Sequence, residues 1–266
     1  MNSPTLTHQL VFNLARRDIR ARYQGSMLGL LWVILNPLIL LAMYSFVFTV
    51  VFRAKWNAPQ VGEAESSLFD FAILLFCGLI IHAFLAEILS AAPKLILSNK
   101  NFVKKVVFPL TALPIVTTCT AIFHFAIKLV VLALFILAVY KALPITALYA
   151  PLIFLPLIIL SLGLGFAFAS LGVYLRDINQ IIPPLLTGLL FIGPILYPTD
   201  AAPEPLRPFL FLNPLSVPVE QIRNVMIFGQ QPDWIPLAIY SGVAVCVFLL
   251  GLVWFQKTKP GFSDVV

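Results

Sequence analysis

Four arginines within seven residues near the start of the chain form its densest group of anion-binding side chains. A guanidinium presents paired N–H donors that match two oxygens of a phosphate or carboxylate. An uncharged apolar run begins at Leu28, so we expect the cluster to lie at a membrane surface, against lipid phosphates or a partner protein. A simple anchor that follows the positive-inside rule is the alternative. The four residues are Arg16, Arg17, Arg20 and Arg22.

Polar side chains inside apolar runs form a second group, because such residues are costly at membrane depth and usually have a reason to be there. Asn36, His82 and Glu87 lie in the first two apolar runs. His124 and Lys128 follow in the third at i, i+4 spacing. A proton relay would use such groups, but in the sequence they are isolated from one another. Hydrogen bonds between helices, or snorkelling of the long side chains, are therefore the favoured interpretation.

Enzyme signatures are absent from the sequence. It contains no G-x-x-x-x-G-K-[ST] phosphate loop, no H-E-x-x-H and no G-x-S-x-G, and no hydrophilic stretch long enough for a soluble domain. The three cysteines lie in apolar runs without a metal-binding spacing. We therefore expect no catalytic residue, metal or cofactor in this chain. If ATP drives it, the ATPase is another chain.

The composition indicates a membrane protein. Apolar residues make up 61% of the chain and charged residues 11%, against about 45–50% and about 25% in soluble domains. The first apolar run, Leu28–Phe52, would rise about 37 Å as a helix, which is enough to cross a hydrocarbon core of roughly 30 Å with some tilt. It is far too long for the apolar part of a cleaved signal peptide.

Charge and proline divide the chain into six apolar spans. The third and fourth are longer than one straight crossing, and their prolines allow interfacial turns or a kink. Residues 201–230 carry five prolines, so we expect short helices that dip into one membrane face. The predicted spans are Leu28–Phe52, Phe71–Ala92, Val106–Tyr140, Ile145–Leu175, Ile178–Tyr197 and Trp234–Phe255.

Lysine and arginine predict the orientation of these spans. Eleven of the seventeen fall on the side of the N-terminus, five, including Arg223, on the other side, and Lys128 inside the third span. Asp70 is placed on the other side too. Cytoplasmic segments carry the excess of positive charge, so both termini are predicted to be cytoplasmic.

The fold class predicted is all-α integral membrane, with six transmembrane helices and short re-entrant outer helices before the last span. Apolar residues recur at spacings of three and four from Leu10 to Tyr23, which is typical of an amphipathic helix lying in the plane of the inner interface. The predicted divisions are this interface helix in residues 1–27, a six-span domain in residues 28–258 and a cytoplasmic tail in residues 259–266.

Several stretches resemble the type-2 ABC exporter permeases that move undecaprenyl-linked polysaccharides. RRDIRARYQGSMLGLLWVILNPLILL (residues 16–41) is similar to the N-terminal signature of that family, and LSNKNFVKKVVFPLTALPI (residues 97–115) to its first cytoplasmic loop. YLRDINQIIPPLL, PILYP, NPL and KPGFSDVV follow in the same order as in the family. The resemblance covers nearly the whole chain and is closer to O-antigen permeases than to teichoic-acid or capsule permeases.

The resemblance implies a half-transporter of the bacterial inner membrane, which pairs with a copy of itself and with two ATP-binding subunits that hold ATP and Mg. Its substrate would be a polysaccharide on a lipid pyrophosphate, moved from cytoplasm to periplasm, and the arginine cluster would suit the pyrophosphate. No nucleic acid is implied as a partner. A type-2 exporter of a small hydrophobic compound, an ion-coupled carrier and an integral membrane enzyme are the alternatives.

Two cytoplasmic segments are positioned to receive motion from an ATPase, which can push only on parts that reach it. Residues 93–108 join the second and third spans, and residues 176–180 join the fourth and fifth. Phe102 is predicted to seat in a groove of the partner. The alternative is that the lysines of this segment only follow the positive-inside rule. The predicted coupling residues are Asn99, Lys100, Phe102, Lys104, Lys105, Arg176 and Asp177.

Aromatic residues on the first and fifth spans form the last group. Sugar faces stack on aromatic rings, and such rings would hold a glycan weakly enough for it to slide. Contact with lipid, or membership of an interfacial aromatic belt, is the alternative for each of them. The predicted glycan-path residues are Trp32, Tyr44, Phe48, Phe191 and Tyr197.

Overall fold

The computed structural model describes residues 4–51, 68–103 and 108–265, and every regular element in these ranges is helical. Among the described residues, six short 3-10 or π segments and three α-helices of four residues connect or extend the longer helices. In chain order the elements are α1 (Pro4–Tyr23), η1 (Gly29–Leu31), α2 (Trp32–Ser45), η2 (Phe46–Val51), α3 (Leu68–Ser98), α4 (Lys100–Val103), α5 (Ala112–Tyr140), η3 (Ile145–Tyr149), α6 (Ala150–Tyr174), α7 (Ile178–Ile192), η4 (Thr199–Ala201), η5 (Glu204–Leu206), α8 (Arg207–Leu210), α9 (Ser216–Met226), α10 (Trp234–Thr258), η6 (Lys259–Gly261) and α11 (Phe262–Val265).

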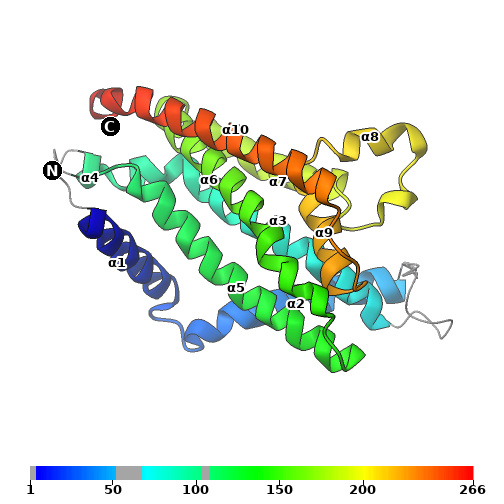
Figure 1. Ribbon diagram of the computed structural model, residues 1–266. Helices are drawn as coiled ribbons and strands as arrows, with labels where there is room; N and C mark the ends of the chain where they lie inside the picture. Colours follow the sequence, from blue (N-terminus) through cyan, green and yellow to red (C-terminus); the bar gives the residue numbers. More distant parts are fainter. Residues whose placement is uncertain (1–3, 52–67, 104–107, 266) are drawn as a thin grey trace.

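Helix α3 is the centre of the bundle. It contacts α2, α5, α6, α7 and α9 (Figure 1), and its apolar residues are buried over most of its circumference. A helix that is apolar on all sides belongs in such a position. Ring contacts extend the core outwards, because Phe125 of α5 lies edge-on to Phe84 of α3 and to Phe154 of α6, with ring centroids 5.3 and 4.3 Å away.

Glycine allows α6 and α10 to approach closely. A Cβ atom placed on Gly251 would lie 2.1 Å from the carbonyl oxygen of Gly163, and one on Gly163 would lie 2.5 Å from the Cα of Phe248. Small residues at such crossings let helix backbones meet inside a membrane, where van der Waals packing drives association. This pair therefore fixes the closest crossing between these two helices.

Four helices are long and apolar enough to cross a membrane, counted over the described residues. They correspond to the second, third, fourth and sixth predicted spans, although α3 runs beyond the predicted end at Ala92 to Ser98. The first predicted span becomes α2 followed by the π-helical η2. The fifth is only the fifteen residues of α7, because Gly193 and Pro194 end the helix before Tyr197. The count of six crossings therefore remains a prediction.

The proline-rich segment forms short helices, as its composition predicts, and α9 is held in place by a buried arginine. The Arg223 guanidinium donates to the carbonyl oxygen of Leu74 in α3 at 2.9 and 3.0 Å and to those of Pro194 and Ile195 at 2.5 and 2.9 Å. Arg223, which the sequence places among the charges of the outer side, is buried, since only 4% of the residue is exposed. Asp70 is buried too, and it accepts a hydrogen bond of 2.7 Å from the Tyr140 hydroxyl.

Both ends of the chain lie at the same end of the molecule as α4 (Figure 1). Helix α1 lies alongside the first half of α5, and it contacts α5 more than any other element. Its apolar residues face the bundle, since Ala15 is buried while Leu14 and Ile19 are half-buried. The amphipathic pattern of the sequence thus produces a helix that packs on α5, while its orientation in the membrane plane stays a prediction.

Candidate functional site

The Glu87 carboxylate joins three helices at the end of α1. Its Oε1 atom accepts a hydrogen bond of 2.6 Å from Arg22 Nη1 of α1 and lies 2.7 Å from His124 Nδ1 of α5. The Arg22 contact is an ion pair, and the side chain of Glu87 on α3 is only 13% exposed. A buried carboxylate needs charged or hydrogen-bonding partners of this kind.

The geometry assigns the His124 tautomer. Glu87 can only accept, so Nδ1 carries the proton that is donated to it, and Nε2 is left to accept from the Tyr23 hydroxyl at 3.1 Å. Burial raises the pKa of the Tyr23 hydroxyl above its ordinary value, which keeps that donor protonated. The His124 side chain is 3% exposed, and both of its ring nitrogens are therefore satisfied.

This cluster corrects two expectations from the sequence. Glu87 and His124 are partners, not isolated groups, and Arg22 pairs with Glu87 instead of extending only toward lipid. Arg16, Arg17 and Arg20 are exposed on α1, as the amphipathic pattern predicts. Arg17 also lies 3.5 Å from the neighbouring Asp18 carboxylate, in an exposed pair of little energetic weight.

His82 has a structural role in this arrangement. Its Nε2 donates to the carbonyl oxygen of Leu186 in α7 at 2.9 Å, which ties α7 to α3. His82 lines a different cavity from the one that Glu87 and His124 line. This contact agrees with the interpretation that polar residues at membrane depth join helices.

Two cavities meet beside the Glu87 cluster. The first has a volume of about 350 Å³ and is lined by Arg22, Tyr23, Glu87 and His124 together with residues of α2. The second, of about 260 Å³, extends between α2, α3 and α7. Asn36, Pro37 and Lys128 line both cavities.

The structure separates the predicted glycan-path aromatics. Trp32 lines the first cavity and Tyr44 the second. Phe191 is exposed near the end of α7, and the Tyr197 hydroxyl donates to the Phe191 carbonyl oxygen at 3.0 Å, beyond that helix end. Neither lines these two cavities. The side chain of Phe48 lies outside what the structure describes.

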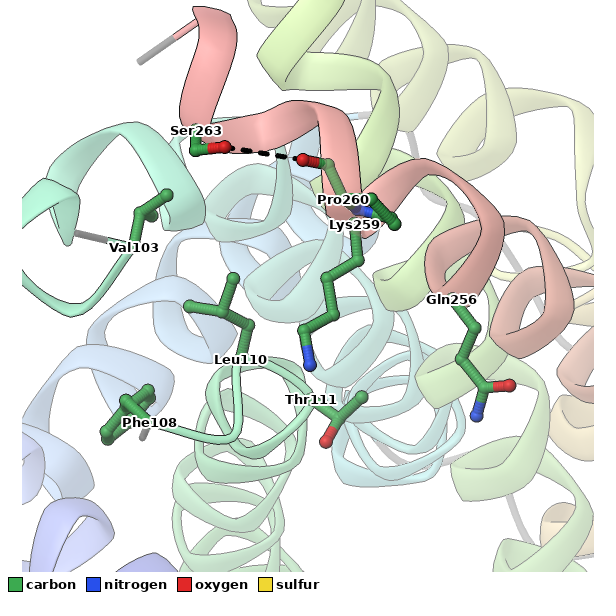
Figure 2. Close-up of a pocket in the computed structure, with 8 residues that line it drawn as sticks. All are labelled: Val103, Phe108, Leu110, Thr111, Gln256, Lys259, Pro260 and Ser263. Atoms are coloured by element: carbon green, nitrogen blue, oxygen red, sulfur yellow. Dashed lines mark hydrogen bonds between the residues drawn. The ribbon is translucent and has the colours of Figure 1, made fainter. Parts of the chain in front are cut away.

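A groove at the end that carries both chain termini is formed by two distant parts of the sequence. It has a volume of about 560 Å³, and in Figure 2 the Lys259 side chain reaches into it toward Leu110 and Thr111. The C-terminal turn is tied to α6, because Tyr174 donates to the Thr258 carbonyl oxygen at 2.9 Å. The lining residues are Val103, Phe108, Leu110, Thr111, Gln256, Lys259, Pro260 and Ser263.

None of the predicted coupling residues that the structure describes lines this groove, although Phe102 contacts Phe108 of its wall. Phe102 is half-buried and stacks on Phe108 with ring centroids 4.3 Å apart, so its ring packs within the chain instead of projecting as a free knob. The Asn99 amide donates to the Leu95 carbonyl oxygen at 2.8 Å and caps the end of α3. Lys100 is exposed. Lys104 and Lys105 lie outside the described residues.

The second predicted coupling segment is a short exposed turn between α6 and α7. Arg176 and Asp177 are both exposed there. The Arg176 carbonyl oxygen accepts a hydrogen bond of 3.0 Å from the Asn179 amide, which closes the turn. The two charged side chains thus project from a fixed turn.

Two features of this site were missed from the sequence. The Arg22–Glu87 pair joins residues 65 positions apart, and only the charge of Glu87 inside an apolar run indicated that a cationic partner was required. Lys259 was assigned to the cytoplasmic tail and Gln256 to the membrane domain just after the last span, whereas both line the groove with residues from the start of α5. No local spacing relates these parts of the chain.

Comparison with known proteins agrees with this architecture. The family profile described as ABC-2 type transporter matches residues 9–227. The chain is 26% identical to the O-antigen export system permease protein RfbA of Klebsiella pneumoniae over 260 residues, covering 97% of this chain and 95% of the relative. The protein of the same name from Myxococcus xanthus is 26% identical over 259 residues, with the same coverage.

A relative with another name is similar over most of its length too. The polysialic acid transport protein KpsM of Escherichia coli is 26% identical over 252 residues, which cover 91% of each chain. The match to the family profile extends from α1 to the end of α9 and so includes the Glu87 cluster and both cavities. The chain belongs to the ABC-2 type transporter family.

Proposed function

We propose that this chain is the permease subunit of an ATP-driven exporter that moves undecaprenyl-pyrophosphate-linked polysaccharide of the O-antigen type from cytoplasm to periplasm. The observation that carries this proposal is the similarity to O-antigen export permeases along 97% of the chain. A bundle of long apolar helices with cavities along α2 suits a subunit that passes its substrate through a membrane.

The partners proposed are a second copy of this chain and two ATP-binding subunits. The sequence has no phosphate loop, so ATP and Mg would bind to the partner subunits. Exposed apolar residues on α2 and α7, including Leu40 and Ile181, offer surface for a second copy or for lipid. The location proposed is the bacterial inner membrane, with both termini in the cytoplasm, which their shared end of the molecule supports.

The groove shown in Figure 2 is the proposed contact for the ATP-binding subunit. It combines an apolar wall from Val103, Phe108 and Leu110 with the Lys259 ammonium, so it suits a segment with an apolar side chain and a nearby carboxylate. Phe102 would act by supporting that wall through its stacking on Phe108. Motion of the ATPase would then reach α5 and α10 together, because the groove joins the start of α5 to the end of α10.

Deletion and complementation of the gene test the proposal. In the bacterium that carries it, deletion should abolish surface polysaccharide while lipid-linked polysaccharide accumulates in the cytoplasmic leaflet, and the intact gene should restore display. The readout is the ladder of long-chain lipopolysaccharide on a gel. Unchanged surface polysaccharide, with increased sensitivity to a small hydrophobic compound, would favour the alternative of a small-molecule exporter.

A further inference from the structure

Lys128 carries a positive charge at membrane depth, inside the apolar helix α5. It lies sixteen residues into α5 and is half-buried. Within the part of the chain that the structure describes, its ammonium takes part in no ion pair and no hydrogen bond. A charged group in such a position normally pairs with another group or lines a route for a charged ligand.

The charges around Lys128 do not balance. Arg22 and Lys128 contribute two positive charges to the 350 Å³ cavity, and Glu87 is its only acid. Glu87 Oε1 is already used by Arg22 Nη1 and by His124 Nδ1. Two cations face one acid among the residues that line the cavity, so positive charge is in excess and an anion would complete it.

The cavity is also rich in hydrogen-bond donors. Arg22 Nη1 donates to Glu87, and a guanidinium carries five N–H donors in all, so it can offer others to a ligand. The Asn36 amide lines the same space from α2, opposite Lys128 of α5. Guanidinium, ammonium and amide N–H groups around one space suit phosphate oxygens.

We propose that Lys128, Arg22 and Asn36 form a phosphate-binding site that takes the pyrophosphate of a polyprenyl lipid from the membrane. Leu40 lies one helical turn after Asn36 on α2, is exposed, and lines the second cavity with Asn36 and Lys128, so it offers an apolar surface for the attached hydrocarbon. The choice of a polyprenyl carrier rests on the proposed function. The site differs from Arg16, Arg17 and Arg20 on the exposed face of α1 because it combines Arg22, at the end of α1, with residues of α2 and α5.

Ligand binding to the purified complex tests this site. The chain with its ATP-binding subunit is titrated with farnesyl pyrophosphate in detergent, and bound ligand is counted by native mass spectrometry. Lys128→Met should weaken binding about tenfold or more, since a hydrogen bond to a charged group is worth about 1.5–3 kcal/mol. Lys128→Arg should retain binding, because it keeps the charge. Lys141→Met, the same change at an exposed position at the other end of α5, should have no effect.

Three results would overturn the proposal in different ways. Equal binding by wild type and Lys128→Met shows that Lys128 does not hold the phosphate. Binding of phosphatidylglycerol as tight as that of farnesyl pyrophosphate, with the same loss in Lys128→Met, assigns the cavity to ordinary phospholipid headgroups. Binding of farnesol as tight as that of the pyrophosphate shows that only the hydrocarbon is recognised. If Lys128→Met does not fold, Asn36→Ala is used with the same criteria.

The binding assay is independent of transport. A wild-type complex that exports polysaccharide in cells but binds no farnesyl pyrophosphate overturns this site and leaves the proposed function intact. A complex that binds farnesyl pyrophosphate through Lys128 but supports no polysaccharide export overturns the proposed function and leaves the phosphate site intact.

Discussion

The Glu87 carboxylate holds together the end of α1 and the centre of the bundle. It receives a guanidinium from α1 and an imidazole N–H from α5 at one oxygen. Losing the carboxylate would leave Arg22 and His124 without their acceptor, and unpaired buried donors cost more than a hydrogen bond contributes. We therefore expect this pair to determine whether α1 stays docked.

Glu87→Gln should lower the free energy of unfolding by about 2 kcal/mol, because the charged acceptor is lost. Arg22→Gln should destabilise the protein through the same pair. The double variant should then lose less than the sum of the single losses, by about 1 kcal/mol. Purified protein is heated to a series of temperatures, and size-exclusion chromatography gives the temperature at which half of the single folded species is lost. Strictly additive losses of stability would show that the two side chains do not interact.

Replacing Arg16, Arg17 and Arg20 with Gln should reduce export while leaving the protein inserted. These side chains are exposed on α1, so their removal costs little stability but removes three donors for phosphate at the membrane surface. The measurement is surface polysaccharide at matched protein levels in the membrane. Normal display would reduce the cluster to an anchor that follows the positive-inside rule.

At the residue scale the sequence predicts which groups are unusual but not their partners. An acid and a histidine in apolar runs are visible from hydropathy alone, and both are in the cluster. Their pairing joins α1, α3 and α5, and it depends on how these helices rotate against each other. Arg223 shows the same limit, since a basic residue beside prolines reads as an outer charge until Leu74 of α3 is seen to accept its N–H groups.

At the scale of elements, the crossing of α6 and α10 leaves no space for an added side-chain atom at its glycines. Gly251 meets the Gly163 carbonyl oxygen, whereas a Cβ on Gly242 of the same helix would have no atom within 4 Å. The two glycines therefore form a matched pair of positions with different surroundings.

Gly251→Ala should destabilise the protein by about 2 kcal/mol or more, because the added methyl group separates α10 from α6. Gly242→Ala should be neutral or slightly stabilising, since alanine is preferred to glycine in a helix by about 1 kcal/mol. Thermal stability of both purified variants measures the difference. Equal stability of the two variants would contradict the close crossing.

Phe102→Ala should weaken coupling more than Lys104→Ala. The Phe102 ring supports Phe108 at the groove wall, and losing an aromatic anchor often costs about 2 kcal/mol at an interface. Removing a single lysine charge usually costs less, because water and salt screen it. Export and ATP hydrolysis of the reconstituted complex are measured for both variants. Failure of Lys104→Ala beside normal Phe102→Ala would make the contact electrostatic, and two normal variants would exclude this loop as the coupling element.

Helices are more predictable here than their ends. Long apolar runs gave α3, α5, α6 and α10 nearly as observed, because hydrophobicity alone determines them. Helix α7 is shorter than its apolar run, since Gly193 and Pro194 stop the helix while the hydrophobic pattern continues. The groove could not be predicted, because its walls come from the start of α5 and the C-terminal turn.

At the scale of the whole molecule, we propose that transport depends on two kinds of subunit with different roles. This chain supplies cavities at membrane depth and a groove at the end that carries both termini, and the ATP-binding subunit supplies energy. The coupling groove lies beside the start of α5 at Ala112. The Lys128 cavity lies near the middle of the same helix, about 24 Å further along. A displacement of α5 would therefore reach both.

Transport by the reconstituted complex tests the central claim most directly. The chain and its ATP-binding subunit are placed in vesicles with the ATP-binding side outward, and lipid-linked polysaccharide is supplied in the outer leaflet. The prediction is that added ATP and Mg make the polysaccharide inaccessible to an external glycosidase, whereas a non-hydrolysable ATP analogue does not. Polysaccharide that stays fully accessible while ATP is hydrolysed, or that crosses without ATP, would contradict an ATP-driven polysaccharide exporter.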